Sequence, residues 1–247
     1  MKNTAIIIPS RLNAKRFPRK PLAEINNIPM IVHVLNRAKE TKLGEVIVAT
    51  PDSEIFNVVN KNGGKAVLTK QNHNSGSDRI YEVYLSELKD KVDLIFNLQG
   101  DMPNINPQSI LKLDKLMRDN NCSIGTLAAN LKERNDVKNP NIVKVHVAQP
   151  LKNNEFVEAK DFFRTKKDLK NQMIYHHIGI YAFTNNALSK YVKLSRSKLE
   201  VERNLEQMRA MENNLPIKVG LSNSVPLGVD TQEDLVKVSK EMQKYEK

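Results

Sequence analysis

The chain has 247 residues, of which 40% are hydrophobic and 27% charged, and its formal net charge is +11. Its single cysteine, Cys122, excludes an internal disulfide and a multi-cysteine zinc site, and no apolar run approaches the ~20 residues that cross a bilayer. We therefore expect a cytoplasmic protein without membrane insertion. The length suits one α/β domain over residues 1–247, with a sub-lobe at about 140–180.

The positive charge permits nucleic acid, an anionic surface or a phosphorylated substrate as partner. Aromatic residues make up only 5% of the chain, tryptophan is absent, and no zinc-finger spacing or RNA-binding signature occurs in the sequence. Nucleic acid is therefore not the expected partner. A basic module that binds nucleic acid or anionic surfaces stays open as a rival hypothesis, and a sugar-nucleotide glycosyltransferase is a third.

The first half of the sequence alternates between strand and helix patterns. The predicted strands are residues 6–8, 45–49, 66–69 and 92–98. Helices are predicted over 30–42, after Asp52, after the polar segment 72–79 and over 107–120, with Asp52 and Asn106 as the N-caps of the second and the last. This rhythm predicts an α/β fold with a mainly parallel central sheet and helices on both faces, a three-layer sandwich.

The alternation then breaks. Residues 142–148 and 155–159 predict a β-hairpin that leaves the main sheet, and this hairpin forms the small sub-lobe. Further strands are predicted over 178–183 and 217–221. Ser197 and Glu200 form a capping-box pattern that opens a long helix to about residue 213, and Thr231 begins the final helix.

A basic loop follows the first strand and contains Arg11, Arg16 and Lys20 between prolines. Ligands of open α/β sheets bind beyond the carboxyl ends of the strands, so this loop is placed to hold a polyphosphate. The sequence has no GxxxxGK[ST], GxGxxG or HExxH motif, and side chains must therefore hold the phosphates. A solvated basic loop is the open alternative, and Lys15 and Arg19 are expected to be solvated charge.

Two carboxylates are candidates for a hard cation. Asp101 follows the most buried predicted strand, after Gln99 and Gly100, and Asp230 precedes the final helix. A polar turn at Asp101 and a helix cap at Asp230 are the alternatives. Together the two carboxylates and the basic loop would form a magnesium–nucleotide site.

Eight motifs occur in the order of a known family, at residues 8–11, 16–22, 48–52, 75–79, 97–101, 177–181, 205–209 and 229–231. On these motifs the chain resembles the 3-deoxy-manno-octulosonate cytidylyltransferase (CMP-Kdo synthetase) family, which implies a nucleotidyltransferase-like sandwich. The resemblance implies Mg²⁺-dependent transfer of the cytidylyl group of CTP to the anomeric hydroxyl of 3-deoxy-D-manno-octulosonate (Kdo), with release of pyrophosphate. The product would serve lipopolysaccharide synthesis, and a homodimer is expected.

The resemblance also implies roles for individual residues. Catalytic roles fall to Arg11, Lys20, Asp101 and Asp230, of which Asp101 and Asp230 would hold the metal. The residues that would bind the nucleotide are Ser10, Arg11, Arg16, Lys20, Asn74, Ser75, Gly76, Ser77 and Gln99. Those that would bind the sugar are Gln99, Arg164, His177, Tyr181, Glu206 and Gln207.

Two departures from the family pattern are visible. The common Gln-Gly-Asp-Glu-Pro sequence carries Met102 in place of the glutamate, which removes a carboxylate beside Asp101. Only 12 residues separate Arg164 from His177, so a sugar-facing loop is shortened relative to the family. The second departure leaves the sugar identity open between Kdo and a related acid, such as a sialic-type nonulosonate or a modified Kdo.

Overall fold

The computed structural model describes residues 3–13, 16–166 and 172–244, so Lys15 lies outside the described residues. Its contacts group the chain into two units, Met1–Ile110 with Pro226–Lys247 (unit 1) and Leu111–Val225 (unit 2). The division falls within α4 (Pro107–Asp119). Asn106 directly precedes this helix and accepts a hydrogen bond from the backbone N–H of Gln108, as expected of an N-cap residue. The expectation of a single domain stays a prediction.

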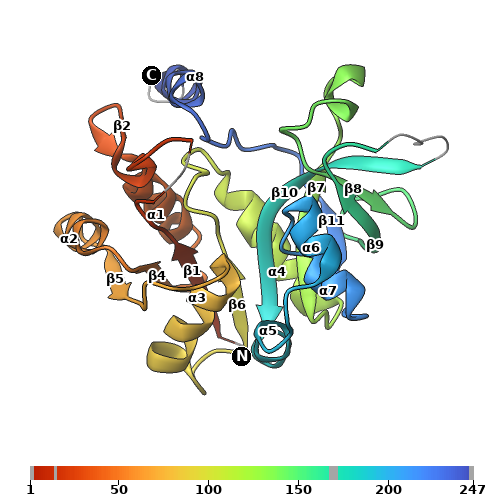
Figure 1. Ribbon diagram of the computed structural model, residues 1–247, viewed down its shortest axis with the longest axis horizontal. Coiled ribbons are helices and arrows are strands. Elements are labelled where there is room, and N and C mark those ends of the chain that lie inside the picture. Colours follow the sequence, from red (N-terminus) through yellow and green to blue (C-terminus); the bar gives the residue numbers. More distant parts are fainter. Residues whose placement is uncertain (1–2, 14–15, 167–171, 245–247) are drawn as a thin grey trace. The chain divides into compact units, whose positions relative to one another are not determined.

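Unit 1 is built on four parallel strands in the order β5, β4, β1, β6 (Figure 1). They are β1 (Thr4–Pro9), β4 (Gly44–Thr50), β5 (Lys65–Leu68) and β6 (Leu94–Asn97). Five of the six residues of β1 and all four of β6 are buried. Because neighbouring side chains of a strand point to opposite faces, other elements cover both faces of these two strands.

The helices of unit 1 follow its strands, as the alternating pattern predicts. They are α1 (Met30–Glu40), α2 (Ser53–Lys61), α3 (Gly76–Val83) with a π-helical continuation over Tyr84–Leu88, and α8 (Gln232–Gln243). A 3-10 turn (Lys20–Leu22) and the short antiparallel hairpin of β2 (Glu24–Ile25) and β3 (Ile28–Pro29) connect β1 to α1. The mixed α/β class expected from the sequence is confirmed.

The last segment of the chain completes the core of unit 1. Val229 and the α8 residues Leu235, Val238 and Met242 are buried in one cluster with Ile25 and Met30. Helix α8 accordingly lies beside β2 (Figure 1). Unit 1 therefore needs residues from both ends of the sequence.

Unit 2 contains five strands that pair into a closed ring. They are β7 (Ile124–Ala129), β8 (Lys144–Val147), β9 (Phe156–Phe163), β10 (Met173–Thr184) and β11 (Lys218–Leu221). The order is β10, β7, β11, β9, β8, and β8 pairs back with β10. Of these pairs only β7–β11 is parallel, so unit 2 departs from a mainly parallel arrangement.

The predicted hairpin forms, but it does not leave the sheet. Strands β8 and β9 are antiparallel neighbours, β9 also pairs with β11, and β8 also pairs with the start of β10. A free hairpin would expose unpaired backbone groups along both edges. Closing the ring pairs those edges, which is the physical reason for the difference from the sequence prediction.

The predicted long helix after Ser197 is wrong. The capping box at Ser197 and Glu200 forms, but the helix splits into α6 (Lys198–Arg203) and α7 (Met208–Glu212). Asn204 ends α6 in the left-handed conformation, with φ of 51°, which asparagine tolerates better than most residues. The remaining helix of unit 2 is α5 (Asn185–Val192).

No helix among the described residues combines the length and the apolar character that a membrane span requires.

Candidate functional site

The basic loop after β1 is tied to the end of β4. The backbone N–H of Ser10 donates to the carbonyl of Ala49 at 2.9 Å, and that of Leu12 donates to Oδ2 of Asp52 at 2.8 Å. Asp52 stands at the predicted N-cap position of α2, but its carboxylate makes no cap hydrogen bond. The carboxylate of Asp52, which was predicted to cap α2, therefore anchors the basic loop instead.

Two carboxylates from distant parts of the sequence meet at one lysine. The Nζ of Lys20 donates to Oδ2 of Asp101 at 3.1 Å, to Oδ1 of Asp230 at 3.4 Å and to the carbonyl of Val229 at 2.6 Å. Arg16 adds a second cation, with its Nη2 2.8 Å from Oδ2 of Asp230. The Lys20 side chain is only 12% exposed, so its charge is held in place beside both carboxylates.

Asp230 does not cap the last helix, which was the alternative to a functional role. Thr231 is the N-cap of α8 and forms a capping box with Asp234. The carboxylate of Asp230 instead faces Arg16 and Lys20. A backbone hydrogen bond of 3.0 Å from Val229 to Asp101 fixes the spacing of the two acidic segments.

Arg11 is exposed and forms no ion pair or hydrogen bond with any described residue. Burial, followed by the nearby charge of Arg11, lowers the pKa of Arg79. A cation that lacks a carboxylate partner is available to an incoming anion. Arg19 differs, because its guanidinium forms an exposed ion pair with Glu54, in keeping with the prediction that it is solvated charge.

The polar segment before α3 meets the end of β6. Ser75 caps α3, and the Oγ of Ser77 accepts a hydrogen bond from Nδ2 of Asn97 at 3.3 Å. Nε2 of Gln99 in turn donates to Oδ1 of Asn97 at 3.2 Å. Gly76 lies over the same amide, since a Cβ there would be 3.8 Å from Nδ2 of Asn97. Four of the predicted nucleotide-site residues are thereby brought to one place in unit 1.

The carboxyl ends of β1 and β6 approach each other closely. A Cβ at Gly100 would lie 3.2 Å from the carbonyl oxygen of Pro9, so any larger residue there would be tightly packed against β1. The next residue, Ser10, is 6% exposed, and its buried Oγ has no hydrogen-bond partner among the described residues. Buried hydroxyls are normally satisfied, so this one is a candidate for contact with a ligand. Asn74, just before the N-cap of α3, is exposed.

The residues present fit a divalent cation only in part. Among the described residues, no group of three or more acidic, histidine or cysteine side chains is arranged to hold a metal. Asp101 and Asp230 still offer two hard oxygen donors at one point. Mg²⁺ is usually bound by one or two carboxylates together with water and substrate phosphates, so the pair suits a metal that arrives with a nucleotide.

Two of the predicted sugar-site residues lie together on β10 in unit 2. The ring centroids of His177 and Tyr181 are 5.4 Å apart, His177 is buried, and the hydroxyl oxygen of the half-buried Tyr181 is buried as well. Burial, reinforced by the charge of Glu206, raises the pKa of Tyr181 well above its usual value. The Tyr181 hydroxyl has no hydrogen-bond partner in the described part of the chain.

Glu206 and Gln207 occupy the break between α6 and α7. The hydroxyl of Tyr191 donates to the carbonyl of Glu206 at 2.7 Å, and the guanidinium of Arg209 lies 5.1 Å from the Tyr191 ring. Arg209 is itself paired with Glu200 through two hydrogen bonds of 2.8 and 2.9 Å. This buried pair was not predicted from the sequence, although Arg209 stands within the motif at 205–209.

Arg164 lies at the end of β9, and its guanidinium hydrogen-bonds to backbone carbonyls of unit 2. Its Nη1 donates to two carbonyls of the loop 139–142, each at 3.2 Å, and Nζ of the buried Lys144 donates to the other two at 2.7 and 2.8 Å. Burial, followed by the charge of Arg164, lowers the pKa of Lys144. The burial of Lys144 was not predicted either, because a lysine within a strand pattern normally indicates the solvent face.

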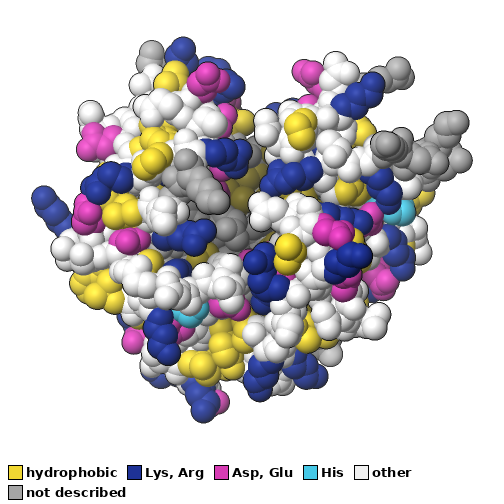
Figure 2. Space-filling model, in the orientation of Figure 1, with side chains coloured by type: hydrophobic (Ala, Val, Ile, Leu, Met, Phe, Trp, Pro, Cys, Tyr) yellow, Lys and Arg dark blue, Asp and Glu magenta, His cyan; other side chains and the backbone are white. Residues whose placement is uncertain are grey.

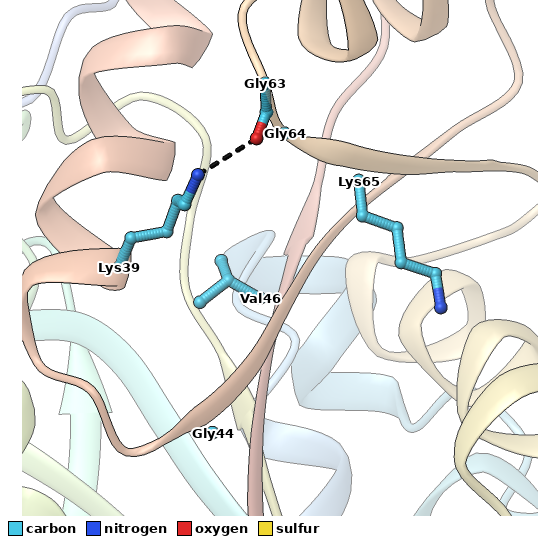
Figure 3. Close-up of a pocket in the computed structure, with 6 residues that line it drawn as sticks. All are labelled: Lys39, Gly44, Val46, Gly63, Gly64 and Lys65. Atoms are coloured by element: carbon cyan, nitrogen blue, oxygen red, sulfur yellow. Dashed lines mark hydrogen bonds between the residues drawn. The ribbon is translucent and has the colours of Figure 1, made fainter.

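A separate hollow of about 340 Å³ is lined by Lys39, Gly44, Val46, Gly63, Gly64 and Lys65. Figure 3 shows Lys39 hydrogen-bonded to the carbonyl of Gly63, while the ammonium of Lys65 lies away from that contact. Gly44 and Lys65 begin β4 and β5. The hollow is therefore at the amino ends of the strands, opposite the edge where the predicted nucleotide residues gather.

The positive charge does not form a stripe on the face drawn in Figure 2. Lys and Arg side chains there are interspersed with acidic and neutral ones. Nucleic-acid-binding proteins usually cluster such residues on one face or along one helix. This face therefore offers no support for the rival hypothesis of a basic binding module.

Comparison with known proteins identifies the class. A family model described as Cytidylyltransferase matches residues 5–219. A synthase of 4-diphosphocytidyl-2C-methyl-D-erythritol from Anaerococcus prevotii shares the fold, with a TM-score of 0.66, 16% identity and coverage of 98% of this chain and 99% of that one.

Closer relatives define the family within that class. "3-Deoxy-manno-octulosonate cytidylyltransferase" of Brucella anthropi is 43% identical over 233 residues, 94% of this chain and 93% of the relative. That of Brucella ovis is 44% identical over 234 residues, 94% and 92% of the two chains. A structure of CMP:2-keto-3-deoxy-manno-octonic acid synthetase complexed with CTP superposes with a TM-score of 0.88, at 34% identity, over 99% of this chain and 100% of that one. The chain belongs to the 3-deoxy-manno-octulosonate cytidylyltransferase family, which confirms the resemblance found in the ordered motifs.

Proposed function

We propose that this protein transfers the cytidylyl group of CTP to the anomeric hydroxyl of Kdo and releases pyrophosphate. The observation that carries the proposal is the identity of 43–44% across 94% of the chain to relatives named for this activity. The convergence of Lys20, Asp101 and Asp230 at one point of unit 1 supports it. In this reaction the anomeric hydroxyl loses its proton to solvent and its oxygen forms a bond to the α-phosphorus. The bond from that phosphorus to the oxygen that bridges it to the β-phosphate breaks, and pyrophosphate leaves.

The basic loop is the proposed site of the departing phosphates. Arg11 has no anionic partner among the described residues, and Arg16 is exposed beside Asp230. Lys20 is held at the same place by two carboxylates and a carbonyl. These three cations would stabilise the negative charge that develops on pyrophosphate as it leaves. Ser10, the segment 74–77 and Gln99 would contact the nucleoside and its phosphates.

Asp101 and Asp230 would hold Mg²⁺ when CTP is bound. The metal would neutralise phosphate charge and so lower the barrier to attack at the α-phosphorus. Lys20 balances the two carboxylates together with Arg16, because its Nζ contacts both and Arg16 pairs with Asp230. Its ammonium would turn toward the phosphates when the metal takes over part of that charge balance.

The sugar-site residues are proposed to act from unit 2. Arg164 retains guanidinium nitrogens beyond the one that binds the loop 139–142, and these would pair with the sugar carboxylate. His177, Tyr181, Glu206 and Gln207, with Gln99, would contact sugar hydroxyls. A homodimer, a cytoplasmic location and a role in lipopolysaccharide synthesis accompany this proposal as predictions.

A related sugar acid is the second candidate substrate, because only 12 residues separate Arg164 from His177. Purified protein should release pyrophosphate from CTP and Mg²⁺ when Kdo is added, measured by a coupled phosphate assay. A parallel assay replaces Kdo with a nine-carbon sialic-type acid. Release with the nine-carbon acid alone would move the assignment to a nonulosonate cytidylyltransferase, and release with neither acid would refute the enzyme proposal.

Asp101→Asn and Asp230→Asn test the carboxylate pair. Each should reduce turnover on the order of 100-fold or more, because a neutral amide binds Mg²⁺ poorly, while the far-ultraviolet circular dichroism stays that of the parent. Asp93→Asn is the matched control, since this exposed carboxylate precedes β6 whereas Asp101 follows it. A basic binding module would instead retain salt-dependent binding to nucleic acid in all three variants, without turnover.

A further inference from the structure

Strand β10 is interrupted where it passes the predicted sugar-site residues. Its register against β7 shifts between Ile178 and Tyr181, so that Ile178 faces Leu127 and Tyr181 faces Thr126. Residues four apart on a regular strand are separated by about 13 Å. The ring centroids of His177 and Tyr181 are nevertheless only 5.4 Å apart. The bulge shortens β10 locally and places these two rings side by side.

The hydroxyl of Thr126 fills the bulge. This fully buried group lies 2.6 Å from the carbonyl of Ile180, 3.1 Å from that of Ile178 and 3.0 Å from Nε2 of His177. A hydroxyl has one proton to donate, and 2.6 Å is the distance that suits an O–H···O hydrogen bond. The proton therefore goes to Ile180, and the hydroxyl oxygen is left to accept.

This leaves His177 in one tautomer. Because the Thr126 oxygen accepts, Nε2 of His177 must carry the proton, and Nδ1 keeps a lone pair. Burial, followed by the charge of His176, lowers the pKa of His177 to about 3, so the ring is neutral at physiological pH. Phe162 packs edge-on against the imidazole, with centroids 5.0 Å apart, and restrains its orientation. Within the described residues, no group donates to Nδ1.

We propose that Thr126 is a positioning residue that sets His177 as a hydrogen-bond acceptor, so that Nδ1 of His177 and the hydroxyl of Tyr181 together bind a neutral hydroxyl of the sugar. A hydroxyl donates and accepts, and it therefore satisfies a lone pair and an O–H at once. A carboxylate only accepts and would leave Nδ1 unpaired. The pair thus selects a hydroxyl-bearing part of the sugar and leaves the acid group to a cation. The proposal rests on the proposed function.

The first test observes the tautomer directly. Protein labelled with ¹⁵N-histidine should show, for His177, a protonated Nε2 and an unprotonated Nδ1 between pH 6 and 8. In Thr126→Val, which keeps the shape but removes the oxygen, this fixed tautomer should be lost, whereas Thr126→Ser should retain it. A protonated Nδ1 in the parent protein would overturn the proposal whether or not the variant folds.

The second test separates the two substrates. Thr126→Val should lower kcat/KM for the sugar acid roughly 10- to 100-fold and leave KM for CTP within about twofold, because only a sugar contact is lost. Thr126→Ser, which keeps the hydroxyl, should have a kcat/KM for the sugar acid close to that of the parent. Tyr181→Phe should also raise KM for the sugar but keep the His177 tautomer. If Thr126→Val impaired kcat/KM for CTP as much as kcat/KM for the sugar acid, Thr126 would have only a structural role, and the proposal would be overturned.

The two readouts also distinguish this inference from the proposed function. If the parent protein turns over no sugar acid, the proposed function fails while the tautomer measurement still stands. If turnover occurs with the other tautomer in place, the proposed function stands and the role of Thr126 is refuted.

Discussion

Charge at the proposed nucleotide site depends on the contacts of individual residues rather than on the number of cations in the loop. Lys20 is nearly buried beside Asp101 and Asp230, whereas Arg19, one residue earlier, is exposed and paired with Glu54. The sequence places both in the same basic stretch. The fold shows how the two differ, because Lys20 faces the two carboxylates and Arg19 pairs with Glu54 in solvent, as expected for solvated charge.

Lys20→Met should therefore lower kcat/KM for CTP on the order of 100-fold or more, because it removes an ammonium placed to stabilise developing phosphate charge. The fold should survive, since the carboxylates it leaves behind are 35% and 49% exposed and can be hydrated. Pyrophosphate release at varied CTP measures the effect. Arg19→Gln is the matched control and should stay within about twofold of the parent. Comparable losses in the two variants would mean that Lys20 has no special role.

Much of the site in unit 1 was predictable from residues alone. Arg11, Arg16 and Lys20 follow β1 and Asp101 follows β6, and strand ends can be read from apolar runs and breakers, whereas Asp230 stands before the predicted start of the final helix. Thr126 could not be predicted. It lies inside a buried strand, and its hydroxyl gains importance only because the opposite strand bulges around it.

Helix ends were predicted correctly where side chains close in sequence determine them. The capping box at Ser197 and the N-cap at Asn106 both form, because each depends on side chains within a few residues of the backbone groups they bind. The break at Asn204 was missed, since an amphipathic pattern runs through it. The ring closure of β8 onto β10 was also missed, because pairing between distant strands leaves no local trace.

The buried ion pair between α6 and α7 should make unit 2 sensitive to the loss of one partner. Glu200 and Arg209 have side chains that are 3% and 2% exposed, so Glu200→Gln leaves a buried guanidinium without its charge partner. The expected loss is about 3–5 kcal/mol in the free energy of unfolding, measured with urea at pH 7. Lys198→Ala breaks the exposed pair with Glu202 on the same helix and should change little. Equal effects would exclude a special role for the buried pair.

The ion pair of Glu200 and Arg209 also predicts how the free energy of unfolding depends on pH. Burial opposes ionisation of Glu200, but hydrogen bonds from Arg209 and Arg196 outweigh it and lower the pKa of the carboxyl below its usual value of about 4.5. A carboxyl whose pKa is lower in the folded state than in the unfolded state stabilises the fold at pH values above the unfolded-state pKa. This contribution to the free energy of unfolding is lost as the pH falls through the folded-state pKa. The gap in stability between the parent and Glu200→Gln should hence narrow below about pH 4.5. A constant gap down to pH 3 would contradict this account.

At the scale of the whole molecule, the net charge of +11 should act through self-repulsion. The Debye length is about 10 Å at 0.1 M salt, so added NaCl screens repulsion between exposed lysines and arginines. We expect the thermal midpoint to rise between 0.02 and about 0.3 M NaCl while KM for CTP increases. Differential scanning calorimetry and initial rates measure the two effects, and a midpoint that falls with salt would show that surface ion pairs dominate.

The return of the final segment to unit 1 has a consequence for biosynthesis. Asp230 and the α8 residues that complete the core around Ile25 and Met30 leave the ribosome only after all of unit 2 has been made. Until then, Lys20 lacks one of its two carboxylates and the hairpin of β2 and β3 lacks its cover. A nascent chain should accordingly expose this apolar patch to chaperones and stay catalytically silent throughout elongation, so that activity appears only once the last segment has docked.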